Sequence, residues 1–234
     1  MQSLSVVLPA LNEQCNLMST LERAVRDLGS LRLHWEIIVV DDGSTDDTPS
    51  VCQTLADHYV DRIKIIRHDC NRGYGAALRS GFSTAKYELV FFTDSDGQFR
   101  FDGLQKFLLH IETCDMVIGF RELRRDPWFR KTNSRIGNLL ARAMLGVKVR
   151  DINCAYKLFR KSLLSTLPLR SEGALINTEI LAFAARRGWK HIEVPVSHYP
   201  RRFGNPTGAN FWVILKTFKE YFILRKRMNQ IKAE

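Results

Sequence analysis

The stretch LVFFTDSDGQ, residues 89–98, decides the fold class. Leu89–Thr93 is a short, mostly apolar run of the kind that forms a buried strand, and two carboxylates, Asp94 and Asp96, follow it at once. Residues two apart in an extended segment point the same way, so these carboxylates form a pair with the small Ser95 between them. The stretch therefore predicts a buried strand with an acidic site at its carboxyl end.

Three further strands are predicted upstream, each followed by a polar turn and a helical pattern. The predicted strands are residues 5–10, 36–40 and 63–66. Asn12 is expected to cap the first helix, and residues 76–85 form the third. Strands that alternate with helices favour an α/β fold with a mostly parallel central sheet flanked by helices, which binds ligands at the carboxyl ends of its strands.

Polar residues gather at those carboxyl ends. They are Asn12 and Glu13, Asp41 and Asp42, the turn 71–75, and Asp94 and Asp96. Turn formation explains any one of these groups, but four groups together favour a binding site. A dinucleotide fingerprint is excluded, because Leu78 occupies the position of its third glycine and the turn follows the third strand rather than the first.

Charge divides the chain into two unequal halves. Residues 1–120 carry 11 Lys/Arg and 17 Asp/Glu, whereas residues 121–234 carry 24 and 8. A nucleic-acid binder does not call for carboxylate clusters in half of its length, so this class is excluded. This division suits a site with two parts. Carboxylates of residues 1–120 would hold a metal, and Lys and Arg side chains of residues 121–234 would bind an anionic phosphate or an acidic lipid surface.

The cysteine pattern favours a reducing compartment, and the lengths of the apolar runs argue against a membrane-spanning segment. The five cysteines contain no Cys-x-x-Cys pair, so neither a disulfide framework nor a zinc site is predicted. We expect no leader segment, and no apolar run approaches the roughly 20 residues that span a bilayer. Membrane association is therefore expected to be peripheral or through a partner.

Asp94 and Asp96 are also the candidate metal ligands. Hard carboxylate oxygens favour Mg²⁺ or Mn²⁺, and the small Ser95 leaves room for a hydrated cation and a diphosphate. An Asp-x-Asp pair alone is common in ordinary turns. Its place at the end of an apolar strand makes the metal interpretation stronger.

Four motifs in order resemble those of a known enzyme family. They are VVLPALNE at 6–13, EIIVVDDGSTD at 36–46, NRGYG at 71–75 and DSDGQ at 94–98. This series is similar to family 2 inverting glycosyltransferases of the GT-A fold, and within them to dolichol- and polyprenyl-phosphate mannosyl- or glucosyltransferases. The resemblance covers about residues 4–204. It implies a GT-A nucleotide-sugar-binding domain over residues 1–210. The pattern of residues 211–234 separately predicts an amphipathic, basic C-terminal helix.

The resemblance implies a donor site in the first half of the chain. The residues expected around the base and ribose of a nucleotide-sugar are Pro9, Leu11, Glu13, Asp41 and Asp42. Asp94 and Asp96 are expected to bind the metal and to be catalytic, with Gln98 nearby as a metal and donor ligand. For Asp41 and Asp42, simple turn capping remains an open alternative.

The second half resembles the lipid-phosphate branch. The residues expected to hold the acceptor phosphate are Arg121, Arg130, Ser134 and Arg201. Arginine suits this task because its planar fork donates two parallel hydrogen bonds to phosphate oxygens. Arg121 and Asp151 are also expected to be catalytic. Asp151 is expected to orient a sugar hydroxyl or an arginine, and to serve as a base only for an alcohol acceptor. Glu179 also matches a family acid, with a structural role equally open.

The chain departs from the family at two places. CAYK at 154–157 stands where a Gly-Phe-Arg-like segment is usual, and GNPTG at 204–208 replaces a common serine-lysine pair. These departures leave the sugar and the acceptor less defined than the reaction type.

The predicted function is metal-dependent, inverting transfer of a hexose from a GDP-mannose or UDP-glucose type donor to polyprenyl or dolichyl phosphate, at the cytoplasmic face of a membrane. Two alternatives remain: a family 2 transferase acting on a sugar or protein hydroxyl, and a noncatalytic module that binds nucleotide-sugar or phosphoinositide. Residues 211–227 have an amphipathic, basic pattern. It fits a helix at a membrane interface, against a membrane-spanning subunit, or against the protein's own core.

Overall fold

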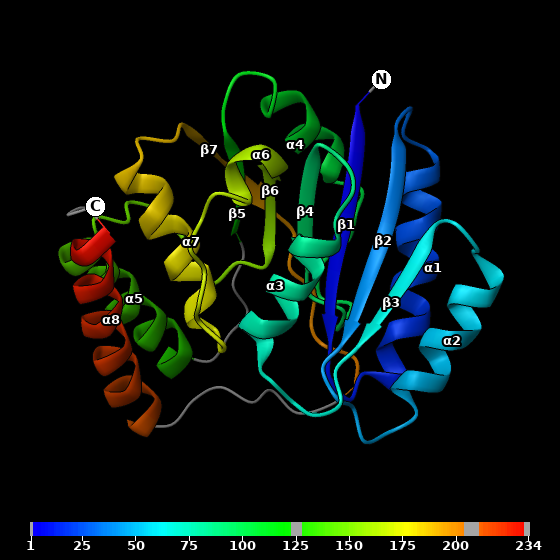
Figure 1. The fold of residues 1–234 in the computed structure, drawn as a ribbon, viewed down its shortest axis with the longest axis horizontal. Helices are drawn as coiled ribbons and strands as arrows, with labels where there is room; N and C mark the ends of the chain where they lie inside the picture. Colours follow the sequence, from blue (N-terminus) through cyan, green and yellow to red (C-terminus); the bar gives the residue numbers. More distant parts are fainter. Residues whose placement is uncertain (1, 123–127, 204–210, 232–234) are drawn as a thin grey trace.

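A computed structural model describes residues 2–122, 128–203 and 211–231, and the side chains of residues 128–136, 211–218 and 231 are outside the description. Its centre is a seven-stranded sheet in the order β3-β2-β1-β4-β6-β5-β7 (Figure 1). The strands are β1 (Ser3–Ala10), β2 (His34–Asp41), β3 (Ile63–Arg67), β4 (Leu89–Thr93), β5 (Met116–Arg121), β6 (Tyr156–Arg160) and β7 (His191–Val196).

Parallel pairing dominates the sheet, as predicted. β1 pairs in parallel with both β2 and β4, β2 pairs in parallel with β3, and β5 pairs in parallel with β7. β6 alone runs against its neighbours, β4 and β5. The predicted α/β class with a mostly parallel sheet is therefore confirmed, and the strand that begins at Leu89 has the predicted bounds.

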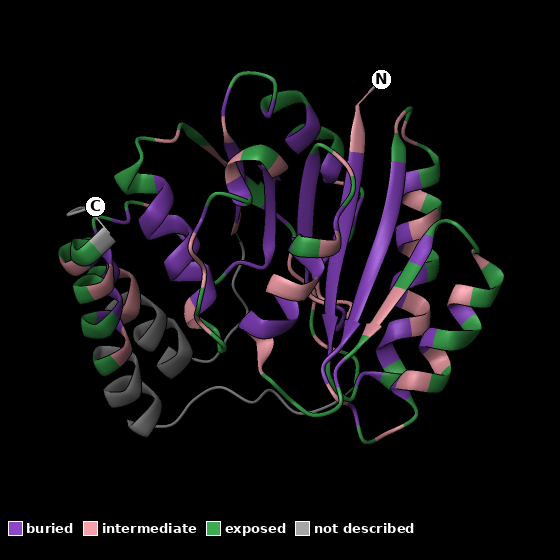
Figure 2. Cartoon of the chain, in the orientation of Figure 1, coloured by how far each residue is buried: buried purple, intermediate pink, exposed green. Residues whose placement is uncertain are grey.

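Helices cover the sheet and extend beyond it on one side (Figure 1). They are α1 (Gln14–Gly29), α2 (Thr48–His58), α3 (Tyr74–Thr84), α4 (Leu104–His110), α5 (Trp128–Leu145), α6 (Lys161–Leu164), α7 (Leu175–Arg186) and α8 (Phe211–Ile231). The inner strands β1, β2, β4, β5 and β6 are mostly buried between these layers, whereas the edge strands β3 and β7 are only partly buried (Figure 2). Their Val, Ile, Leu and Phe side chains form the core, as expected of a sheet covered on both faces.

The first helix begins differently from the prediction. Asn12 does not cap α1; it adopts a positive φ of 55°, and its side-chain oxygen accepts the Thr45 amide at 2.9 Å. The N-cap position is Glu13, which makes no side-chain capping bond. Asn tolerates the left-handed conformation, so Asn12 instead joins the β1–α1 turn to the turn after β2.

The C-terminal helix packs against the rest of the chain through its second half. Tyr221, Leu224 and Met228 are buried in the core beside α5 and α7. Phe222 and Ile223 are exposed on the other face. The predicted boundary at residue 210 lies outside the described residues. Within the described part of the chain, no helix has both the length and the apolar composition to cross a membrane.

Candidate active site

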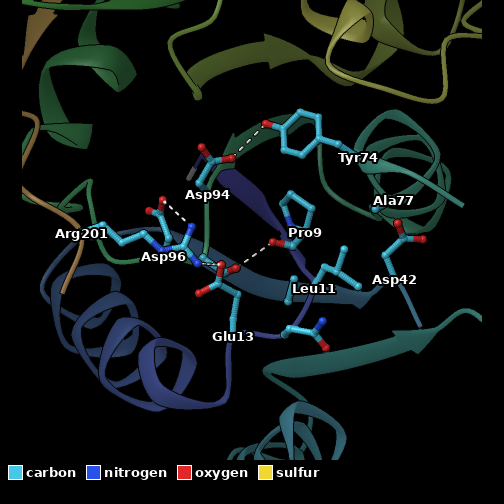
Figure 3. A pocket seen from close by; sticks show the side chains of 12 residues that line it. Pro9, Leu11, Glu13, Asp42, Tyr74, Ala77, Asp94, Asp96 and Arg201 are labelled. Carbon is cyan, nitrogen blue, oxygen red and sulfur yellow. Dashed lines mark hydrogen bonds and ion pairs between the residues drawn. The ribbon is translucent and has the colours of Figure 1, made fainter. Parts of the chain in front are cut away.

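A pocket of about 510 Å³ opens where the chain order of the sheet reverses, at the carboxyl ends of β1, β2 and β4. Such switch points are the usual ligand crevices of open α/β sheets. Its walls include six of the predicted donor and metal residues: Pro9, Leu11, Glu13, Asp42, Asp94 and Asp96 (Figure 3). The four separate sequence motifs therefore meet at one cavity.

Asp94 and Asp96 form the acidic end of the pocket. Tyr74, the first residue of α3, donates a hydrogen bond from its hydroxyl to Asp94 Oδ1 at 3.0 Å (Figure 3). Burial, with the carboxylate of Asp96, raises the pKa of Asp94 to about 7. Burial also raises the pKa of Asp96. Two buried carboxylates that resist joint ionisation form a site that a divalent cation would stabilise.

Asp42 lines the opposite side of the pocket and is held by three donors. Its Oδ1 lies 2.6 Å from His68 Nδ1 and accepts the Arg72 amide at 3.0 Å, while Oδ2 accepts the Gly73 amide at 2.7 Å. The other imidazole nitrogen of His68 contacts Ser80 Oγ at 2.9 Å. This network fixes the carboxylate before a ligand arrives. His68 was missed from the sequence because nothing in its neighbourhood marks its pairing with a residue 26 positions away.

Arg201 joins two acidic residues at the mouth of the pocket. Its Nη2 donates to Glu13 Oε1 at 2.5 Å, and its Nη1 lies 3.9 Å from Asp96 Oδ2 (Figure 3). Asn16 donates to the other Glu13 oxygen at 2.7 Å. Burial raises the pKa of Glu13, and these partners oppose that change. Arg201, predicted for the acceptor phosphate, therefore lies directly beside the predicted donor and metal residues.

Gln98 does not line the pocket. Its side-chain amide donates to the Tyr199 carbonyl at 3.0 Å, and the Tyr199 amide donates back to the Gln98 carbonyl at 2.9 Å. The Gln98 amide also donates to Asp96 Oδ1 at 3.0 Å. Gln98 therefore fastens the segment that carries Arg201 to the turn that carries Asp96. Its predicted role as a metal ligand remains a prediction.

Arg121 and Asp151 form a two-pronged ion pair. Arg121 Nε donates to Asp151 Oδ2 at 2.7 Å, and Nη2 donates to Oδ1 at 3.0 Å. Their side chains are 12% and 5% exposed, so water screens the pair weakly. Arg121 ends β5, and Asp151 lies in the loop before β6. The charge of Arg121 acts to lower the pKa of Asp94, so the pair lies near the acidic end of the pocket, but neither residue lines it.

Lys157, which sequence reasoning did not select as a site residue, lies fully buried in β6. Its ammonium donates to the carbonyls of Ile152 at 3.0 Å and Cys154 at 2.5 Å, and to Asn177 Oδ1 at 2.8 Å. Burial lowers its pKa to about 8, although Asp151 and Asp94 favour the charged form. Three acceptors satisfy its three protons. Lys157 therefore holds the 151–154 loop against α7.

Three other predicted residues are not seen at the pocket. Asp41, the last residue of β2, accepts the Ser44 amide at 2.9 Å and pairs with Arg67 at 3.4 Å, and it does not line the cavity. Arg130 and Ser134 lie in α5, where side chains are outside the described part of the structure. The motif at 204–208 also lies outside the described residues.

The carboxylate oxygens of Asp94 and Asp96 are suitable ligands for a divalent cation such as Mg²⁺ or Mn²⁺. Asp94 and Asp96 supply hard oxygens on one wall, and their raised pKa values mark excess buried negative charge. Among the described residues, no group of three or more His, Cys, Asp or Glu side chains is placed to hold a metal. A two-carboxylate site of this kind suits Mg²⁺, which keeps waters and takes substrate phosphates as its other ligands.

Fold and pocket together define an α/β protein with an acidic site at the switch point of its sheet. Residues 5–167 match the sequence profile of the family described as glycosyl transferase family 2. The chain belongs to this family, which confirms the resemblance found in its motifs.

Curated relatives with similar sequences carry the names of enzymes that transfer a sugar. The chain is 32% identical over 202 residues to undecaprenyl-phosphate 4-deoxy-4-formamido-L-arabinose transferase of Sodalis glossinidius, covering 86% of this chain and 61% of the relative. The transferase of that name from Edwardsiella ictaluri is 30% identical over 205 residues, covering 87% and 62%. The chain thus spans about three fifths of the length of these relatives.

Solved structures share the fold at lower identity. Glucosyl-3-phosphoglycerate synthase from Mycobacterium tuberculosis, in complex with Mn²⁺, UDP and glucosyl-3-phosphoglycerate, has a TM-score of 0.65 and 22% identity, covering 86% of this chain and 73% of that chain. Another structure of that enzyme has a TM-score of 0.67 and 20% identity, covering 95% and 79%. At this identity, the likeness supports the fold alone.

Proposed function

We propose that the chain is a metal-dependent, inverting glycosyltransferase that moves a sugar from a nucleotide-sugar to a polyprenyl phosphate. The observation that carries the proposal is the pocket at the switch point, where Asp42 lies on one wall and the Asp94–Asp96 pair on another. Membership of glycosyl transferase family 2 supports the reaction class. The names of the curated relatives support an undecaprenyl-phosphate type of acceptor.

The donor would lie along the pocket from Asp42 to Asp96. Asp42 is fixed by its three donors, and Oδ2 keeps capacity to accept an N–H or O–H group from the base or ribose. Leu11 and Pro9 add apolar surface beside it. A diphosphate would then reach the acidic pair, where a bound Mg²⁺ or Mn²⁺ would neutralise the charge of the departing nucleoside diphosphate.

The chain's own residues would position the two substrates. A phosphate acceptor is already largely dianionic near neutral pH, so it needs little help from a general base. Arg121, Arg130, Ser134 and Arg201 are the proposed acceptor contacts. A single in-line displacement by the phosphate oxygen would form the new bond to the sugar carbon, release the nucleoside diphosphate and invert that carbon.

Asp151 favours a phosphate acceptor over a hydroxyl acceptor. A hydroxyl acceptor needs a base to remove its proton, and Asp151 was the candidate. Both Asp151 oxygens accept hydrogen bonds from the Arg121 guanidinium, so this carboxylate is already engaged in holding that side chain. We therefore assign Asp151 to orienting Arg121.

The site of action is proposed to be the cytoplasmic face of a membrane, reached by a peripheral contact or through a membrane-spanning subunit. A polyprenyl phosphate keeps its chain in the bilayer and its phosphate at the surface. α8 exposes Phe222 and Ile223 next to Arg225 and Lys226, which suits contact with an anionic interface.

A donor panel tests the proposal. UDP- and GDP-hexoses would be supplied with Mn²⁺ and undecaprenyl phosphate in detergent, and the lipid product identified by mass spectrometry. We expect turnover with one donor class, loss of turnover with a chelator, and recovery on adding Mn²⁺. Transfer to a water-soluble sugar or peptide instead would overturn the acceptor assignment. Nucleotide binding without transfer to any acceptor would indicate a noncatalytic module.

A further inference from the structure

A short loop braces the N-terminus of α3. This bracing loop is residues 170–173, immediately before α7. The Glu172 carbonyl accepts the Gly75 amide at 2.5 Å and the Ala76 amide at 3.3 Å, and the Arg79 guanidinium donates to the Ser171 carbonyl. The first amides of a helix have no partner within the helix. The bracing loop, about 100 residues later in the chain, supplies that partner for α3.

Two glycines of the NRGYG motif make the contact close. Gly73 has a φ of +96°, and a Cβ placed on it would lie 2.5 Å from the Glu172 carbonyl oxygen. A Cβ on Gly75 would collide with the Ser171 carbonyl oxygen. Because backbone packs on backbone here, neither segment can shift without moving the other.

The braced end of α3 also holds both walls of the pocket. Tyr74 donates its hydroxyl to Asp94 at 3.0 Å, and the Gly73 amide donates to Asp42 at 2.7 Å. A displacement of this helix end would therefore change the orientation of both carboxylates. The bracing loop lies behind these contacts, and none of its residues lines the pocket.

Glu179 of α7 fixes the bracing loop from within the core. It is fully buried, and its carboxylate accepts the Ser171 amide at 2.8 Å and the Arg170 amide at 3.1 and 3.2 Å. Arg227 of α8 forms an ion pair with it, and the Arg227 side chain is 18% exposed. A carboxylate held by two backbone amides and one guanidinium has its buried charge compensated.

We propose that Glu179 is a positioning residue of the pocket and that Arg227 links the C-terminal helix to it. Contacts run from Arg227 through Glu179, the bracing loop and the N-terminus of α3 to Asp42 and Asp94. The consequence for catalysis rests on the proposed function, since the pocket must be the donor site. The structural part of the proposal, that Glu179 holds the N-terminus of α3 in place, does not rest on the proposed function.

Hydrogen exchange tests the structural part without any ligand. Glu179→Gln keeps the shape of the side chain but removes its charge, so amide exchange in residues 73–77 and 170–173 should rise roughly 10- to 100-fold. Glu172→Gln is the matched control, because that side chain is exposed and only its carbonyl contacts α3. Unchanged protection of residues 73–77 in Glu179→Gln, or an equal rise in the control, would overturn the proposal.

Substitution of Arg227 provides a second route if Glu179→Gln does not fold. Arg227→Met should raise exchange at 73–77, and Arg227→Lys should restore part of the protection. Arg225→Met, on an exposed position of the same helix, should leave exchange unchanged. If Arg227→Met folds and residues 73–77 keep wild-type protection, α8 has no link to the pocket.

Kinetics and nucleotide binding test the consequence for catalysis. In Arg227→Met, the donor KM and the calorimetric Kd for Mn²⁺ with UDP or GDP should rise about tenfold, whereas the KM for undecaprenyl phosphate should not change. A fall in kcat alone, with donor KM unchanged, would contradict positioning of the donor pocket. If the wild-type protein binds neither nucleotide, the proposed function fails, while the exchange results still decide whether Glu179 positions α3.

Discussion

The two halves of the molecule differ in how far their charged side chains are paired. In the first half, carboxylates face an open cavity: Asp42 is oriented by three donors, and Asp94 and Asp96 carry raised pKa values because burial opposes their ionisation. In the second half, cations are already paired, Arg121 with Asp151 and Arg201 with Glu13. The negative charge of the Asp94–Asp96 pair is thus only partly compensated, whereas Arg121 and Arg201 each already hold a carboxylate partner.

The largest effect should come from a substitution in the Asp94–Asp96 pair. Asp96→Asn removes one of the two carboxylates that would hold the metal, and we expect kcat to fall by about 1,000-fold or more because leaving-group charge would no longer be neutralised. Turnover would be measured against Mn²⁺ concentration, with exposed Asp102→Asn as control. Wild-type Mn²⁺ dependence in Asp96→Asn would remove the proposed metal site.

Breaking the pair in the second half should give the next largest effect. Arg121→Lys keeps the charge but cannot donate two parallel hydrogen bonds to Asp151, so we expect kcat/KM for undecaprenyl phosphate to fall about 10- to 100-fold. Donor binding, measured by calorimetry, should be unaffected. Asp151→Asn should produce a similar fall.

If nucleotide-sugar binding in Arg121→Lys and Asp151→Asn falls as much as the use of undecaprenyl phosphate, the Arg121–Asp151 pair supports the whole site and not the acceptor alone. A wild-type acceptor constant in both would remove Arg121 from the acceptor contacts.

Sequence reasoning predicted the α/β class and the strands β1 to β4 because apolar residues dominate these four strands. Leu89–Thr93 was predicted with its observed bounds. β5 was not predicted as a strand. β6 was not predicted either: CAYK at 154–157 was interpreted only as a departure from a family motif. Its reversed direction comes from pairing with β4 and β5, which lie about 65 and 40 positions earlier in the chain. Local pattern contains no information on such pairing.

The site was predicted in part, for a similar reason. Asp41 and Asp42 are adjacent and were treated alike, yet side chains alternate along an extended chain. Asp41 therefore contacts Arg67, and Asp42 faces the pocket. His68, Tyr74 and Lys157 act through partners distant in sequence, so only the folded chain reveals their contacts.

Substitution of Arg201 should have a smaller effect. It should show whether this side chain acts at the metal site, at the acceptor phosphate, or at both. Its guanidinium lies between Glu13 and Asp96, where it supplies positive charge that a metal would otherwise supply. Arg201→Ala should therefore tighten binding of Mn²⁺ alone about tenfold, while weakening use of undecaprenyl phosphate if it is an acceptor contact. Exposed Arg202→Ala is the neighbouring control.

Mn²⁺ titration without nucleotide and acceptor kinetics would be measured on the same preparations. Tighter Mn²⁺ binding with wild-type acceptor kinetics would assign Arg201 to the donor side alone. Unchanged Mn²⁺ binding would show that its contact with Asp96 does not compete with a cation.

The smallest effect concerns Lys157, the buried cation between the two halves. Burial lowers its pKa from an ordinary value of 10.5 to about 8, so above pH 8 the unfolded chain holds a proton that the folded chain has lost. Stability rises with pH wherever the unfolded state binds more protons. The difference in unfolding free energy between wild type and Lys157→Met should therefore shift in favour of wild type by about 1–2 kcal/mol between pH 7.5 and 9.5. Denaturant unfolding at both pH values would measure it, with exposed Lys106→Met as control. A difference that stays constant with pH would mean that the ammonium of Lys157 keeps an ordinary pKa, because its three acceptors and the nearby Asp151 and Asp94 fully offset its burial.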